Sequence, residues 1–517
     1  MSLYSYHIFY FPFRWDRKGC KNKIFTERFD LNKIKIASDS QWQNISVPLT
    51  PQYQNELYNE KNFYYDFVHS VLYDNGQCNQ QRNPIIRHFE RKEAYNTELR
   101  YNIKVIADHE SFYELKLKSI VLNLYSTGTG IIMFYIENEK YPELDDVRRI
   151  NQFGRRVYPP FLDARIGVAG TKYSELADFI EITGLHGPAQ RYSDDFTSFS
   201  SNDDWKPARF ITSLIEDLTE ELEPPKPVVD DRMFTQCWYF NYNISAMIKD
   251  TSSFNKFVKS VDWNKFLFVD GGSEATCRNS KMLEKQNKKH TYKRWQQNGT
   301  LYGITRYSFV AISNNSTFAQ NVLLTHMRTI YARMAELALL QRASTLKFSD
   351  EVTVLSQLSE RGVRQIANRI SNFYKEYIKF VNQIYFREVT AQEQGIELYT
   401  LMQESMKLNE QVKGLDAEIE ELHNYVALLE DKKRNKTATN LNLIAVLFIP
   451  ASFIATVLGI GFINSGDKII WQACLNDNVL NALILIIGGG LLISGLILFI
   501  MYFKSIINSI KNPFIRK

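Results

Sequence analysis

The stretch LNLIAVLFIPASFIATVLGIGFI, residues 441–463, decides how this chain is interpreted, because it lies in a run from Thr437 to Gly466 that contains no charged residue. A helix of about 20 residues, at about 1.5 Å per residue, spans the roughly 30 Å hydrocarbon core of a bilayer. A second uncharged run, NVLNALILIIGGGLLISGLILFIMYF, covers residues 478–503. The two runs predict transmembrane helices at 437–466 and 478–503, and the alternative is a pair of buried core helices.

Basic residues on the outer sides of both runs predict their orientation, because lysine and arginine concentrate in cytoplasmic segments. We therefore expect an inner- or plasma-membrane protein with both termini cytoplasmic, an outer loop at 467–477 and a basic cytoplasmic tail at 504–517. The N-terminal sequence has no basic segment followed by an apolar one, so we expect no cleaved signal peptide. The flanking basic residues are Lys432, Lys433, Arg434 and Lys436 before the first run, and Lys504, Lys511, Arg516 and Lys517 after the second.

Small and polar residues form a stripe on the first predicted span, with the three- and four-residue spacing of one helix face. Polar groups are costly against lipid, so the stripe predicts a pore lining. Helix packing is the alternative, because small residues also line contacts between membrane helices. Two helices cannot enclose a pore, so conduction requires an oligomer. The candidate pore-lining residues are Asn435, Asn442, Ala445, Ile449, Ser452, Thr456, Gly459 and Gly461.

A heptad pattern runs toward the first span. Apolar residues from Leu401 to Leu429 alternate steps of four and three, which is typical of a coiled-coil seam. Two further helical patterns, at 318–342 and 362–388, precede it. Residues 316–436 are therefore predicted to form long helices and a coiled-coil-like stalk.

Residues 1–315 follow a different pattern. Apolar and polar residues alternate at 101–107 and around Leu115, as expected for half-buried strands. A turn at 126–130 contains two glycines, and Pro142 with the acidic residues after it predicts the start of a helix. Further strands are predicted at 237–242, 266–270 and 301–313. The predicted fold class is an α+β membrane protein, with an α/β cytoplasmic domain at 1–315, a helical stalk and two C-terminal transmembrane helices.

Composition and motifs exclude several classes of protein. The formal net charge is +5 over 517 residues, which is too small to indicate direct binding of nucleic acid. The five cysteines form no CxxC pair and the eight histidines form no HExxH, so no zinc site is predicted. The sequence contains no GxSxG and no GxxxxGK[ST], and Gly128-x-Gly130 leads into a strand rather than a helix. We expect no enzyme and no catalytic residues.

Two kinds of charged cluster are candidate binding sites. Arg155 and Arg156 follow Gly154 at the end of a predicted helix, and paired guanidinium groups there could bind phosphate, with surface salt bridges as the alternative. Pairs of aspartates could bind Mg²⁺ or another divalent cation, or could be solvated surface charge. These pairs are Asp145–Asp146, Asp194–Asp195, Asp203–Asp204 and Asp230–Asp231, and no metal site is assigned.

The order of domain, stalk, basic residues, two spans, short loop and basic tail resembles the CorA family of pentameric cation channels. The best local match is PASFIATVLGIGF, residues 450–462, because CorA proteins have a similar proline-containing run that ends in Gly-Met-Asn-Phe. The resemblance covers residues 320–517 in architecture and is much weaker over the first 315. It implies a homopentamer in a lipid bilayer that conducts Mg²⁺ or another divalent cation.

One departure from the family bears on function. The Gly-Met-Asn of the family stands here as Gly459-Ile460-Gly461. In the family the Asn holds hydrated magnesium, which Gly461 cannot do, so weak magnesium selectivity is expected.

An enlarged N-terminal domain without Gly-Met-Asn resembles the CorA-like effectors of type III CRISPR systems. That resemblance implies gating by a nucleotide second messenger, an S-adenosylmethionine–AMP conjugate. It also implies membrane permeabilisation or ion flux in antiphage defence. The alternative is a CorA-type transporter of magnesium or another divalent cation.

Overall fold

The computed structural model describes residues 3–20, 23, 25–45, 60–73, 84–106, 110–158, 177–196, 207–229, 232–271, 275–356, 363–463, 488–489 and 495. The chain divides into two compact units. Unit 1 consists of residues 1–359 and 365–422, and unit 2 of residues 360–364 and 423–517. The elements that form the candidate site all belong to unit 1.

A mixed sheet forms the centre of unit 1. Its strand order is β11-β12-β13-β10-β1-β6-β5-β4-β7-β8, with β2, β3 and β9 paired beside this path. The pairing of β10 with β13 is parallel, and the other pairings of the sheet are antiparallel. The strands are β1 Ser5–Arg14, β2 Trp42–Asn44, β3 Ile86–Arg91, β4 Leu99–Val105, β5 Ser111–Tyr125, β6 Thr129–Asn138, β7 Phe179–Thr183, β8 Ser193–Asp195, β9 Lys226–Pro227, β10 Phe234–Phe240, β11 Thr291–Tyr292, β12 Leu301–Ile304 and β13 Ser308–Ser313.

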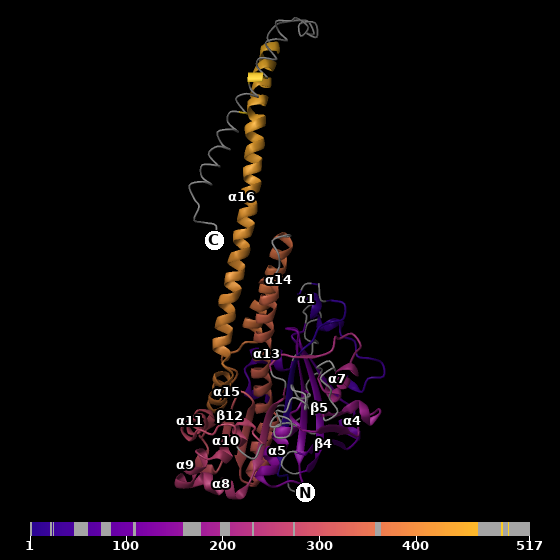
Figure 1. The fold of residues 1–517 in the computed structure, drawn as a ribbon, viewed down its shortest axis with the longest axis vertical. Helices are drawn as coiled ribbons and strands as arrows, with labels where there is room; N and C mark the ends of the chain where they lie inside the picture. Colours follow the sequence, from indigo (N-terminus) through magenta and orange to yellow (C-terminus); the bar gives the residue numbers. More distant parts are fainter. Residues whose placement is uncertain are drawn as a thin grey trace, which may run out of the picture. The chain divides into compact units, whose positions relative to one another are not determined.

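The central strand β1 shows how helices cover both faces of the sheet. Its side chains are buried from Ser5 to Phe13, as expected for a strand covered on two sides. His7 is hydrogen-bonded through Nδ1 to Asn151 on α5 (Leu144–Gly154), at 2.7 Å. Tyr10 donates to the carbonyl of Ala332 on α13 (Ile330–Ser356), at 3.3 Å. Odd and even residues of a strand face opposite ways, so α5 and α13 lie on opposite faces of the sheet (Figure 1).

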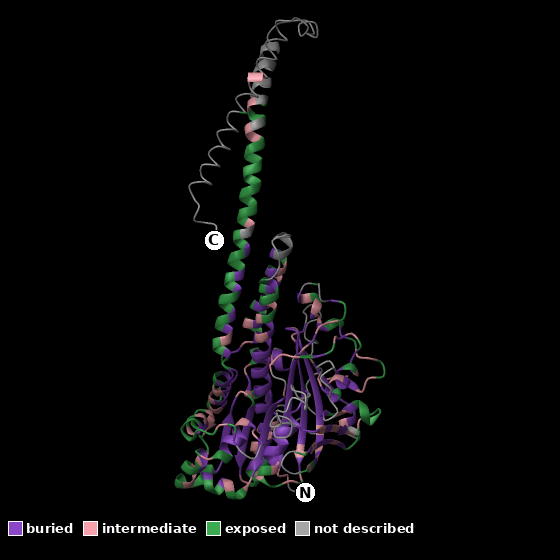
Figure 2. Ribbon diagram, viewed as in Figure 1, coloured by how far each residue is buried: buried purple, intermediate pink, exposed green. Residues whose placement is uncertain are grey.

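Helix α13 is the core helix of one face. Its side chains from Ile330 to Thr345 are buried all round, which is the pattern of an interior helix (Figure 2). Arg333 on this helix is within 2.6 Å of Glu336 and 3.3 Å of Glu60. Glu336 in turn accepts hydrogen bonds from Asn123 and Tyr125 on β5. Buried charges require such partners, so this network fixes α13 against the sheet.

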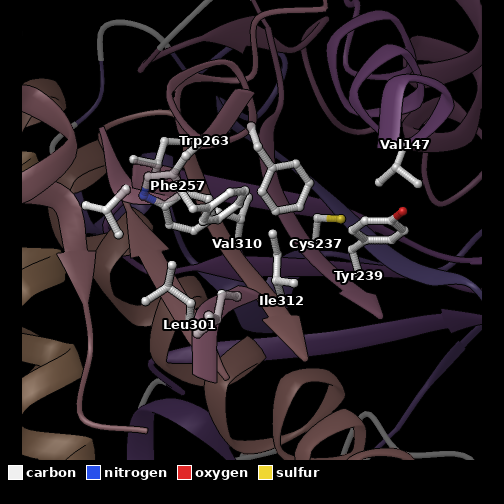
Figure 3. Close-up of a cluster of buried hydrophobic side chains, with 12 residues drawn as sticks. Val147, Cys237, Tyr239, Phe257, Trp263, Leu301, Val310 and Ile312 are labelled. Atoms are coloured by element: carbon white, nitrogen blue, oxygen red, sulfur yellow. The ribbon is translucent and has the colours of Figure 1, made fainter. Parts of the chain in front are cut away.

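The opposite face carries a cluster of short helices. They are α8 (Tyr242–Lys249), α9 (Thr251–Val258) and α10 (Val261–Phe268), which contact one another. A further short helix, α7 (Arg209–Glu216), contacts β8 instead. Trp263 and Phe257 pack on Val310 and Ile312 of β13 and on Cys237 and Tyr239 of β10, in one buried cluster (Figure 3). This cluster fixes α10, whose C-terminal end forms part of the candidate site.

Three more helices follow α13: α14 (Val363–Gln383), α15 (Glu393–Met406) and α16 (Leu408–Ile463). The predicted heptad seam is buried at Leu408, Val412, Leu415, Ile419 and Leu422. Tyr377 on α14 donates a hydrogen bond to Asp416, which places α14 beside this seam. Within unit 1 the apolar seam of α16 is therefore buried by other parts of the same chain, including α14.

Among the helices within the described residues, none is both long enough and apolar enough to cross a membrane. In α16 the charged segment 431–436 is followed by the polar residues Thr437, Thr439, Asn440 and Asn442. The predicted membrane class, the ion-channel interpretation and the inner- or plasma-membrane location are contradicted by this finding. The α+β composition of the fold is confirmed. The second predicted span, the loop and the tail lie outside the described residues, except for 488, 489 and 495.

Several smaller predictions can be compared directly. The strand predicted at 101–107 is confirmed up to Val105, and residue 107 lies outside the described residues. The strand around 115–117, the turn before β6 and the helix after Pro142 are also confirmed. The predicted strand at 266–270 is wrong, because Phe266 and Leu267 belong to α10. The single strand predicted at 301–313 is two antiparallel strands, β12 and β13.

Candidate functional site

A pocket of about 520 Å³ lies where α5, α10 and α11 (Ser280–His290) approach the β12–β13 turn. Arg155, Arg232 and Arg278 all line it, together with the ring of Tyr307. We call it the arginine pocket. Its other lining residues are Gln152, Asn264, Phe268, Val269, Asp270, Thr276, Cys277, Asn279, Met282 and Gln286.

Arg155 enters the pocket from the end of α5. It is the C-cap residue of that helix and is only 4% exposed. Its guanidinium donates to Oε1 of Gln152 at 3.1 Å and to the carbonyl of Val269 at 3.5 Å. Its Cζ atom is 6.0 Å from the ring centroid of Tyr307, within cation–π distance. The end of α5, the residue that follows α10 and the β12–β13 turn together orient the guanidinium of Arg155.

The other two arginines come from distant segments. Arg232 precedes β10 and forms a β-bridge with Arg156, and the neighbouring amide of Met233 donates to the carbonyl of Arg155 at 2.9 Å. Arg278 is exposed and lies directly before Asn279, the N-cap of α11. The Asn279 side chain accepts from the amide of Met282 at 2.9 Å. Three positive charges therefore meet beside the positive end of a helix dipole.

The turn after α10 has an unusual backbone at the pocket wall. Val269 has a left-handed conformation, with φ 54°, which is unfavourable for a β-branched residue. The next residue, Asp270, accepts a hydrogen bond from the amide of Thr276 at 2.7 Å, so its carboxylate is bonded to the segment that precedes α11. Strained residues of this kind often occur at binding sites. Among the lining residues that the structure describes, the pocket thus contains one carboxylate and three guanidinium groups.

The two arginines predicted as a pair are separated by the fold. Arg156 donates through Nε to the carbonyl of Tyr158 at 2.9 Å and through Nη1 to that of Ala177. Its Cζ atom is 4.0 Å from the ring centroid of Phe196. Burial lowers the pKa of Arg156 well below its ordinary value. Arg155 therefore lines the pocket, whereas Arg156 is not part of its lining and binds backbone carbonyl groups.

The candidate pore-lining residues lie on α16. Asn435, Asn442, Ile449 and Ser452 are exposed and Ala445 is half-buried. Thr456, Gly459 and Gly461 fall within the bounds of the helix, but outside the residues whose side chains the structure describes. A pore lining requires a bilayer crossing, and the helices of the described residues include none.

The aspartate pairs have protein partners where they are described. Asp145 is paired with Arg148 at 2.9 Å, and Asp146 accepts from Tyr113 at 3.0 Å. Asp194 accepts the amide of Arg209 at 2.6 Å. The pairs at 203–204 and 230–231 lie outside the described residues. Within the described part of the chain, no group of three or more His, Cys, Asp or Glu side chains could hold a metal ion.

Sequence reasoning missed most of the pocket. Arg232, Arg278 and Tyr307 are isolated residues in three different segments, and no short motif connects them. The one signal in the sequence was Gly154-Arg155-Arg156 at a helix end, which identified Arg155 alone. No protein-family model and no curated protein matches this chain.

Proposed function

We propose that unit 1 is a receptor for a small anionic nucleotide, which binds in the arginine pocket. The observation that carries this proposal is the convergence of Arg155, Arg232 and Arg278 on one pocket of about 520 Å³. Guanidinium groups form charge-assisted, often bidentate hydrogen bonds with phosphate oxygens. A pocket of this size accommodates a nucleotide or a small conjugate.

The remaining lining supports a nucleotide over inorganic phosphate. The ring of Tyr307 is 38% exposed, and can stack on a base. The side-chain amides of Gln152 and Gln286 supply donors and acceptors for base edges. These groups bind and orient a ligand, and the proposal is for binding rather than catalysis.

We propose an S-adenosylmethionine–AMP conjugate as the ligand. The resemblance of the sequence to CorA-like type III CRISPR effectors implies this messenger. Its phosphate suits the three arginines, and its positive charges suit the carboxylate of Asp270, which lines the same pocket. The chain would then act as a ligand-responsive effector in antiphage defence. Neither membrane permeabilisation nor metal transport is part of this proposal.

We also propose that the chain assembles with copies of itself, as a homopentamer. Apolar side chains are exposed on α16 at Leu441, Ile444 and Phe448, with the spacing of one helix face. Other copies of the chain would cover them. A mass measurement on the purified protein tests this: five times the chain mass of 60.4 kDa supports the proposal, and a monomer contradicts it.

Calorimetric titration of the full chain tests the ligand. The conjugate, AMP, S-adenosylmethionine and uncharged adenosine are compared in the same buffer. We expect the conjugate to bind best, AMP more weakly and adenosine not at all. Binding should weaken as salt concentration rises, because phosphate contacts are screened. Equal binding of adenosine and AMP would contradict a phosphate site.

A further inference from the structure

Helix α11 connects the arginine pocket to a second set of contacts. Its N-terminal residues Asn279, Met282 and Gln286 line the pocket, and the helix ends at His290. Eleven residues correspond to about 16 Å of helix at 1.5 Å per residue. A rigid element therefore runs from the proposed ligand to His290.

Three elements meet at the carbonyl oxygen of Ile304, the last residue of β12. Nδ1 of His290 lies 2.7 Å from this oxygen, and the hydroxyl of Ser405 on α15 donates to it at 3.2 Å. A carbonyl oxygen only accepts, so Nδ1 of His290 carries the proton. Ile304 leads into the turn that presents Tyr307 to the pocket, where the Tyr307 amide donates to Thr305 Oγ1 at 3.1 Å.

A second contact joins the segment after α11 to the same helix. Tyr292 donates to Oε2 of Glu397 on α15 at 2.5 Å, and Arg294 lies 2.8 Å from Oε1 of the same carboxylate. The phenol hydrogen bond and the neighbouring guanidinium lower the pKa of Glu397. Glu397 is therefore ionised at neutral pH and paired with residues next to α11.

Helix α15 is joined to α16 by one residue. Lys407 has a left-handed conformation, with φ 58°, and α16 begins at Leu408. Ser405 precedes this joint by two residues. A left-handed lysine is strained relative to other conformations by roughly 1 kcal/mol, so a change in the angle between the two helices at this joint would relieve strain.

From these contacts we infer that ligand binding in the arginine pocket is transmitted through α11, Ile304 and α15 to the beginning of α16. The inference rests on the proposed function, and it assigns regulation to that site. A ligand shifts a conformation only if it binds two states with different affinity. The two states differ in the contacts of Ser405 and Glu397, and these contacts bias the joint at Lys407.

The test uses a covalent stand-in for the ligand, so that it does not depend on knowing the nucleotide. Cys277 lines the pocket and is half-buried, whereas Cys20 and Cys237 are buried. In a full chain with Cys78→Ser and Cys474→Ser, fluorescein maleimide is attached to Cys277. Hydrogen exchange is then measured in α15 and in residues 408–422, with and without the label. We expect a change in exchange of at least about fivefold, the lower end of ordinary coupling between sites.

The double variant Glu397→Gln, Ser405→Ala removes both contacts, and Glu388→Gln is its matched control. Glu388 accepts a phenol hydrogen bond from Tyr65 at 2.7 Å, away from α11. The response of α15 and 408–422 should disappear in the double variant and persist in the control, while residues near Cys277 respond in all chains. No response in the parent chain, or an equal response in the double variant, overturns the inference. Calorimetry on the same variants shows separately whether nucleotide binding itself fails.

Discussion

Oγ of Ser405 on α15 lies 3.3 Å from Nδ1 of His290 at the end of α11, and both atoms contact the carbonyl oxygen of Ile304. Burial lowers the pKa of His290, so the ring is neutral at physiological pH. The residues are 115 positions apart in the chain. Helix α11, which lines the arginine pocket with Met282 and Gln286, is therefore in contact at its other end with α15, the helix before α16.

Replacement of Arg278 by Ala should weaken nucleotide binding at least about tenfold, because a charge-assisted hydrogen bond contributes roughly 1.5–3 kcal/mol. Arg278 is exposed, so the variant should fold normally. Isothermal titration measures the change. Arg209→Ala, an exposed arginine on α7 outside the pocket, is the control and should bind like the parent chain.

Replacement of Arg156 by Met should lower the free energy of unfolding by about 2 kcal/mol, because two carbonyl groups lose their donor. Affinity for the nucleotide should change little, because Arg156 is not among the residues that line the pocket. Urea unfolding and titration measure the two effects. Loss of binding with full stability would instead place Arg156 in the site.

Lys347 on α13 should make stability depend on pH. Burial lowers its pKa to about 7, with Glu351 opposing the shift. Between pH 7 and its ordinary value of 10.5, the unfolded chain binds more protons than the folded chain, so the free energy of unfolding rises with pH. Lys347→Met should remove this rise and stabilise the chain at pH 7 by about 4 kcal/mol.

Urea unfolding at pH 7, 8 and 9 measures this dependence. Lys379→Met removes an exposed lysine, and should leave the pH dependence unchanged. The same slope in the Lys347 variant would show that other groups cause it. The groups with charge interactions with Lys347 are Glu351 on the same helix, Arg28 at the end of the short helix α1 (Phe25–Arg28), Arg14 at the end of β1 and Asp16 just after it.

Gly128 and Gly19 offer a matched pair of backbone tests, because both have positive φ, 78° and 70°. A Cβ atom at Gly128 would lie 2.6 Å from the ring of Phe29 and 2.7 Å from Nζ of Lys347, whereas Gly19 has nothing within 4 Å. Gly19→Ala should cost about 1 kcal/mol of stability. Gly128→Ala should cost at least about 2 kcal/mol more. Thermal unfolding compares them, and equal losses would contradict the packing at this turn.

Local signals in the sequence predicted the parts of unit 1 that depend on near neighbours. Alternation identified β4 and β5, and Pro142 with its acidic neighbours identified the start of α5. The segment predicted as a strand from Phe266 begins inside α10 instead. This segment is helical because Ser260 caps the start of α10, where its side chain accepts a hydrogen bond from the amide of Trp263. The helix is also stabilised by packing on the distant strands β10 and β13.

The arginine pocket could not be predicted as a whole, because its residues come together only through the sheet. The parallel pairing of β10 with β13 brings the turn at Tyr307 beside Arg232, and no local pattern specifies that pairing. The prediction of a membrane span at 437–466 gave more weight to the apolar residues of this segment than to the polar residues among them. The heptad seam was recognised, but the sequence did not indicate that α14 covers it.

The most direct test of the proposed site is protection of Cys277 from alkylation. In the full chain with Cys78→Ser and Cys474→Ser, the rate of reaction with N-ethylmaleimide is measured with and without the S-adenosylmethionine–AMP conjugate. Burial raises the pKa of Cys237 to about 12, so that thiol stays unreactive. The account predicts that a saturating conjugate slows alkylation at least about tenfold, because occupancy closes the pocket to the reagent. An unchanged alkylation rate would contradict the proposed site, whether the conjugate binds elsewhere on the chain or does not bind at all.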